Sequence, residues 1–130
     1  MKRLIATLAL ATVALAAAAC APANADSAGT PAPTVAVDAD SPVVIAQGIQ
    51  FQTKDVTAKA GKPFALKFEN QDTAPHNVSI YTDSSASKRV YEGEIFSQGE
   101  RVYQVPALTA GTYFFRCDVH PDMTGTLTVE

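Results

Sequence analysis

After residue 43, apolar and polar side chains alternate with a period of two in several short segments. This period is typical of half-buried β-strands, because successive side chains in a strand point to opposite faces of a sheet. Glycine, proline and aspartate fall between these segments, as expected of turns. The predicted strands are one or two opening strands at 43–45 and 49–51, then 64–68, 78–80, 102–105, 112–117 and 126–130. About seven short strands at this spacing predict an all-β sandwich or small barrel, with sheets that are antiparallel at least in part.

The N-terminal segment has a different pattern. Lys2 and Arg3 are followed by sixteen uncharged residues, 4–19, which are rich in alanine. A basic start, an apolar run and small residues at its end predict a secretory signal peptide over residues 1–20. A transmembrane anchor is the alternative interpretation, but the run is short and weakly apolar for a span of ~20 residues.

Two cleavage sites compete at the end of this signal. Residues 17–20, Ala-Ala-Ala-Cys, resemble the lipobox of bacterial lipoproteins, in which the cysteine is lipidated and becomes the first residue. Residues 23–25, Ala-Asn-Ala, instead fit cleavage by ordinary signal peptidase after Ala25. The sequence favours lipidation at Cys20, because this residue falls where the apolar run ends.

Residues 21–42 are rich in Ala, Pro, Ser, Thr and Asp and contain no aromatic residue. Four prolines argue against a regular helix or a central strand, so this segment is predicted to be a disordered tether. The folded domain is then expected over residues 43–130. A domain of this size often needs a staple, such as a metal or a disulfide.

The charge balance excludes several function classes. The chain has 10 basic and 13 acidic residues, and removal of Lys2 and Arg3 leaves 8 basic residues and a net charge of −5. This acidic balance and the lack of a basic stripe argue against nucleic-acid binding. The sequence also has no glycine-rich phosphate loop and no nucleophile elbow.

The chemistry is concentrated near the C-terminus. Cys117, His120 and Met123 place a thiolate, an imidazole and a thioether within seven residues, and the only other histidine is His76. Two imidazoles, one thiolate and a weak axial thioether are the donor set of a blue-copper electron-transfer centre. Zinc fits less well, because structural zinc sites use Cys and His without a thioether.

Each of these residues also has an ordinary interpretation. A lone Cys117 is a small buried hydrophobe, Met123 a core gap-filler and His120 a solvated loop residue. A free thiol in an oxidising compartment is exposed to oxidation, however, unless something occupies it. The conjunction of all four residues therefore favours one copper site. The neighbouring charges are interpreted as solvated loop residues: Arg116, Asp118 and Asp122.

The sequence contains the Cys-x-x-His-x-x-Met spacing, the pair His76-Asn77, the lead Gly-Thr-Tyr-Phe-Phe-Arg-Cys and the ending Gly-Thr-Leu-Thr-Val. These four features resemble the cupredoxin (type 1 blue copper) family, amicyanin- and plastocyanin-like. The resemblance covers residues 43–130 and implies a Greek-key β-sandwich of seven to eight short strands. It implies that Asn77 ties the two ligand segments together. It also implies that the edge of His120 passes the electron, beside an apolar surface of Pro75, Pro121 and Met123. The implied copper ligands are His76, Cys117, His120 and Met123.

These observations predict single-electron transfer by one copper ion that cycles between Cu(I) and Cu(II), rather than enzyme activity. An enzyme would need a further copper or an open position, and a CuA centre would need a second thiolate near Cys117. The alternative function is copper binding and delivery in the cell envelope. The expected partners are redox proteins, with membrane attachment through a lipidated Cys20. The expected protein is a monomer, exported to the periplasm or to the outer face of a bacterial membrane.

Overall fold

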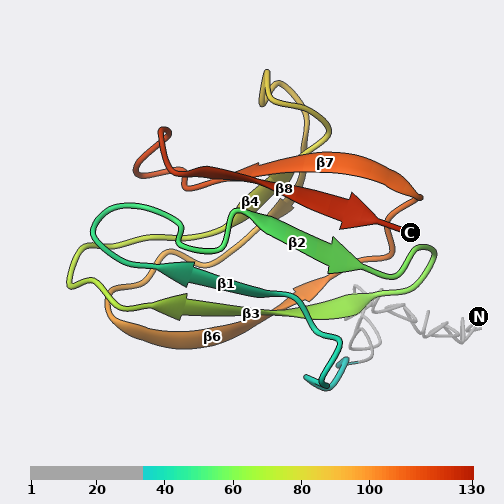
Figure 1. The fold of residues 1–130 in the computed structure, drawn as a ribbon, viewed down its shortest axis with the longest axis horizontal. Coiled ribbons are helices and arrows are strands. Elements are labelled where there is room, and N and C mark those ends of the chain that lie inside the picture. The colour runs from blue at the N-terminus through green and yellow to red at the C-terminus, as the bar shows by residue number, and fades with distance from the viewer. Residues whose placement is uncertain (1–33) are drawn as a thin grey trace, which may run out of the picture. The chain divides into compact units, whose positions relative to one another are not determined.

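The computed structural model describes residues 34–130, which form eight β-strands arranged in two layers (Figure 1). The strands are β1 Val43–Ala46, β2 Asp55–Ala58, β3 Phe64–Asn70, β4 Ser79–Tyr81, β5 Arg89–Glu92, β6 Gly99–Val105, β7 Gly111–Arg116 and β8 Thr124–Val129. One sheet has the order β1-β3-β6 and the other the order β2-β8-β7-β4-β5. This architecture confirms the predicted all-β sandwich. Residues 34–130 contain no helix, and hence none long and apolar enough to cross a membrane.

The sheets are mixed. β1 pairs in parallel with β3, and β2 pairs in parallel with β8, whereas the other pairs are antiparallel. The central pairs carry the alternation that the sequence shows. In β3, Phe64, Leu66 and Phe68 are buried, and in β8 Leu127 and Val129 are buried. Alternation thus locates the strands that pack on the core.

Two strands were not predicted from the sequence, and one possible strand does not form. β2 and β5 are the two edges of the five-stranded sheet, and each buries few side chains, so neither alternates clearly. Of the one or two opening strands expected, only the one at 43–45 forms: Gly48 and Ile49 have φ values of 65° and 57°, which belong to a left-handed turn. Phe51 forms only an isolated bridge with Ala46. β7 ends at Arg116, one residue before its expected end at Cys117.

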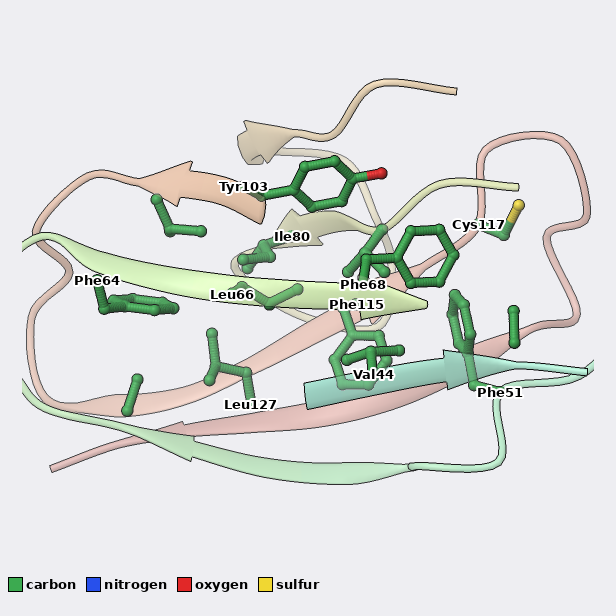
Figure 2. Close-up of a cluster of buried hydrophobic side chains, with 14 of the residues drawn as sticks. Val44, Phe51, Phe64, Leu66, Phe68, Ile80, Tyr103, Phe115, Cys117 and Leu127 are labelled. Carbon is green, nitrogen blue, oxygen red and sulfur yellow. The ribbon is translucent and has the colours of Figure 1, made fainter. Parts of the chain in front are cut away.

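An aromatic cluster joins the two sheets (Figure 2). Phe51 lies between Phe68 of β3 and Phe115 of β7, with ring centroids 6.2 Å and 5.4 Å away. All three rings are almost fully buried. Figure 2 shows Cys117 at one end of this cluster and Phe64 at the other. The buried apolar area therefore fixes the two sheets against each other and ends at the thiol of Cys117.

Gly125 allows β8 to pass closely over the core. A Cβ atom there would collide with the Phe115 ring and would lie 2.6 Å from the carbonyl oxygen of Lys54. Only glycine fits such a close approach. The start of β8, just after Met123, is therefore held tightly against the aromatic cluster.

Residues 34–42, which the sequence places in the tether, contact the domain. The backbone N–H of Val35 donates to the Gln104 side chain, which donates in return to the Val35 carbonyl. Pro42 is buried, and its carbonyl accepts from the Lys67 backbone N–H at 2.9 Å. The predicted signal peptide, the alternative cleavage after Ala25 and the lipidation site at Cys20 lie outside the described residues.

Candidate metal centre

Three side chains from two separate segments converge at one end of the sandwich. His76 precedes β4 and is fixed by two backbone hydrogen bonds with Phe96, each 3.1 Å long. Cys117 directly follows β7, and His120 lies in the turn beyond it. The antiparallel pairing of β4 with β7 brings Ser79 opposite Arg116, so the segment before one strand meets the segment after the other.

The donor atoms of these three residues surround a single point. The Cys117 Sγ atom lies 3.8 Å from His76 Nδ1 and 3.9 Å from His120 Nδ1. The two Nδ1 atoms are 3.0 Å apart. All three donor atoms lie within 4.8 Å of one another, which suits a single metal ion. One thiolate with two imidazoles is a donor set that fits copper well.

Met123 closes the turn that carries His120. The backbone N–H of Met123 donates to the His120 carbonyl at 2.9 Å, and the N–H of Cys117 donates to the Met123 carbonyl at 3.0 Å. Met123 is only 2% exposed, so it is not part of the expected apolar surface. These two bonds fold the Cys-x-x-His-x-x-Met segment into a compact loop, and the role of Met123 as a ligand stays a prediction.

His76 is oriented by an acidic residue that the sequence analysis missed. Its Nε2 atom lies 3.0 Å from an Asp72 carboxylate oxygen. Because a carboxylate only accepts hydrogen bonds, we assign the proton to Nε2, which leaves the Nδ1 lone pair facing Cys117. The N–H groups of Ile49 and Gly48 also donate to Asp72 and lower its pKa. The left-handed turn thus positions Asp72, and Asp72 positions His76.

Asn77 links the segment after His76 to the segment after Cys117. Its side-chain oxygen accepts from the Asp118 backbone N–H at 2.8 Å. Its amide donates to the Gly93 carbonyl at 3.0 Å and to the Asp118 carboxylate at 2.9 Å. Asn77 is fully buried, so these bonds have little competition from water. These bonds join the two segments, and the role of Asn77 in the metal centre stays a prediction.

Asp118 is not the solvated loop charge that the sequence suggested. Its carboxylate accepts hydrogen bonds from the hydroxyl groups of Ser79 and Tyr81 as well as from Asn77, and it is 3.3 Å from the Arg89 guanidinium. Burial raises the pKa of Asp118, but hydrogen bonds from Ser79, Tyr81 and Asn77 outweigh it, with help from Arg89, and hold the pKa below its ordinary value.

Arg116 also departs from the sequence interpretation. It is half-buried, its guanidinium lies over the Tyr81 ring at 4.9 Å from the centroid, and its Nε atom is buried without a partner among the described residues. Asp122, by contrast, is exposed, in agreement with the interpretation as a solvated charge. The alternation along β7 did not indicate that Arg116 and Asp118 would be partly buried while Asp122 is exposed.

Several exposed residues in the segments next to the centre are apolar. Pro75 and Pro121 are exposed and His120 is half-buried. Three exposed aliphatic residues at this end were not predicted from the sequence: Ile49, whose N–H binds Asp72, Ile95, which precedes Phe96, and Val119, which precedes His120. Such residues fall in loops, where periodicity carries no signal.

The chain matches the family model of the cupredoxin-like domain over residues 6–129. The protein therefore belongs to the cupredoxin family, as the ligand-loop motif suggested. Amicyanin of Paracoccus versutus is 30% identical over 100 residues, which are 77% of this chain and 73% of that relative. Amicyanin-alpha of Methylorubrum extorquens is 35% identical over 82 residues, 63% of this chain and 66% of that relative.

Solved structures agree with this assignment. The crystal structure of amicyanin from Paracoccus versutus superposes with a TM-score of 0.56 at 31% identity, covering 72% of this chain and 85% of that chain. A dithionite-reduced auracyanin from Roseiflexus castenholzii has a TM-score of 0.61 at 17% identity, covering 70% and 97%, and shows the fold alone. The fold and the family are thus established together.

Proposed function

We propose that this protein is a single-electron carrier with one type 1 copper ion held by His76, Cys117, His120 and Met123. The observation that carries the proposal is the convergence of the two Nδ1 atoms and the Cys117 Sγ atom on one point. Bound there, copper supplies the Cu(II)/Cu(I) couple. The amicyanin relatives support electron carriage rather than enzyme catalysis.

The residues around the site are suited to transfer with little rearrangement. His76 is anchored by Asp72 and by the bridge to Phe96, and the Cys117 loop is closed by its own backbone bonds. Cys117 and His76 are fully buried, which excludes water from the thiolate and from one imidazole. A donor set fixed in this way would serve both oxidation states with the same positions, and Met123 as a fourth ligand would tune the potential.

His120 is the proposed exit for the electron. It is the one half-buried member of the three converging side chains; exposed Pro121 directly follows it, and exposed Pro75 directly precedes His76. An apolar rim of this kind suits a small, brief contact with a redox protein. We further propose that the protein is a monomer, exported to the periplasm or to the outer face of the membrane, with Cys20 as the lipid anchor. The net charge of −5 after removal of Lys2 and Arg3 favours a redox partner with a basic surface.

The visible spectrum of the Cu(II)-loaded protein tests the proposal. We expect an intense blue charge-transfer band that is lost in Cys117→Ser, whereas Met123→Leu keeps the band and shifts the potential. A colourless Cu(II) complex of the folded protein would overturn the assignment. Repeated reduction and reoxidation then distinguishes the two functions, because a carrier retains its copper, whereas a delivery protein releases it to an acceptor.

A further inference from the structure

The carboxylate of Asp118 is the centre of an enclosed hydrogen-bond network. None of the four proposed ligands belongs to this network. Three donors reach it from β4 and the residues before it: Asn77, Ser79 and Tyr81. The side chain of Asp118 is only 19% exposed. An acidic residue is rarely enclosed to this extent without a charged partner or a dense set of donors. Its position directly after Cys117 makes the network a neighbour of the metal centre.

We propose that Asp118 is a positioning residue of the metal centre and that its fixed negative charge lowers the reduction potential of the bound metal. This inference rests on the proposed function. The positioning part follows from connectivity, since Asp118 joins the Cys117 loop to β4 through its carboxylate and to Asn77 through its backbone N–H. Loss of the carboxylate would release the loop from β4 on one side.

The electrostatic part follows from the composition of the network. Ser79, Tyr81 and Asn77 are neutral donors, which stabilise a carboxylate without cancelling its charge. Arg89 is the cation in contact with Asp118, but it is 3.3 Å away, its side chain is 41% exposed, and it also binds Glu92 at 3.1 Å. The negative charge of Asp118 is therefore only partly compensated. Reduction adds one negative charge to the metal, so a nearby anion favours Cu(II).

The experiment is a potentiometric titration of the copper-loaded full-length protein and three variants. Asp118→Asn keeps the shape and removes the charge. We expect the equilibrium constant for reduction to rise about tenfold, an upward shift of about 59 mV for one electron. Arg89→Gln removes the compensating cation, so we expect a smaller shift downward. Potential shifts of opposite sign in these two variants would indicate an effect of charge, because loosening of the loop would shift the potential in the same direction in both.

Tyr81→Phe is the matched control. It removes one hydroxyl donor to Asp118 and keeps both the ring and the negative charge. We expect no upward shift of the potential in this variant. Thermal unfolding of the copper-free proteins provides a second measurement, in which Asp118→Asn and Tyr81→Phe both lower the unfolding temperature because both weaken the link to β4.

An unchanged or lower potential in Asp118→Asn would overturn the electrostatic part, as would an equal upward shift in Tyr81→Phe. If Asp118→Asn does not fold, the exposed Arg89→Gln variant decides the sign by itself. An unchanged unfolding temperature in Asp118→Asn would overturn the positioning part. Failure of the proposed function is distinguishable, because the unmodified protein would then lack the blue band.

Discussion

The centre of the sandwich and its metal end are held together by different interactions. The centre consists of aromatic and aliphatic side chains such as Phe51, Phe68 and Leu66. The polar residues that are fully buried in the described part of the chain are Asn70, His76, Asn77 and Ser79, and all of them serve the metal end. Apolar burial is non-directional and tolerates exchange, whereas buried hydrogen bonds require fixed partners. The centre thus determines stability, and the metal end determines geometry.

Leu66→Ala gives the largest expected loss of stability. Leu66 is 1% exposed within β3 and lies in the core cluster (Figure 2). Truncation should lower the free energy of unfolding by about 2–5 kcal/mol, measured by denaturant titration of the copper-free protein. The blue band of the folded, loaded variant should stay unchanged. A large spectral change would show that the two regions are not separable.

Gly125→Ala tests the junction between the regions. The added Cβ collides with the Phe115 ring and approaches the Lys54 carbonyl, so β8 must move. We expect a loss of about 1–3 kcal/mol of unfolding free energy together with a changed blue band, because Met123 immediately precedes this strand. Stability equal to that of the unmodified protein would show that β8 can shift freely at this point.

In contrast to Leu66→Ala, Asn77→Ala is expected to change the spectrum of the metal centre more than the stability. It removes the acceptor of the Asp118 N–H and the donor to Gly93. The expected loss of unfolding free energy is about 1–3 kcal/mol, smaller than for the core variant, but the blue band should shift or broaden. Absorption and paramagnetic resonance spectra of the loaded protein measure this. An unperturbed spectrum would contradict the view that Asn77 fixes the two ligand segments.

The pH dependence of stability distinguishes the contribution of Asp72 from that of the apolar core. The N–H groups of Ile49 and Gly48 hold its folded-state pKa below the ordinary value of 3.8. A lowered pKa stabilises the folded protein above pH 3.8, and this contribution disappears as the pH falls through the folded-state value. Asp72→Asn should therefore be less stable than the unmodified copper-free protein near neutral pH. The difference in unfolding temperature should shrink in acid, and a constant difference would contradict this account.

Val119→Ser should have the smallest effect on stability. Val119 is 40% exposed beside His120, and Val102 on β6 is a matched valine with 47% exposure. Both serine variants should stay within about 0.5 kcal/mol of the unmodified protein. Only Val119→Ser should slow electron self-exchange, measured by NMR line broadening in mixtures of the two oxidation states. Equal rates in both variants would place the contact surface elsewhere.

The sequence predicted the central strands well, because residues such as Phe64, Leu66 and Leu127 alternate with polar neighbours and one face of each strand is buried. It missed β2 and β5, since an edge strand buries few side chains and needs no alternation. It also offered residues 49–51 as a possible strand, although Ile49 has a positive φ, because this conformation is rare for a β-branched residue.

For the candidate site, the sequence by itself determined which donors are available. A chain with His76, Cys117, His120 and Met123 as its chemistry-bearing residues, in a Cys-x-x-His-x-x-Met spacing, has few other uses for them. Only the tertiary structure decided what surrounds these donors. The roles of Asp72 and Asp118 depend on hydrogen bonds to groups up to 41 residues away, such as Asn77 to Asp118. Local patterning cannot encode such contacts, because they exist only once strands far apart in the sequence, such as β4 and β7, have paired.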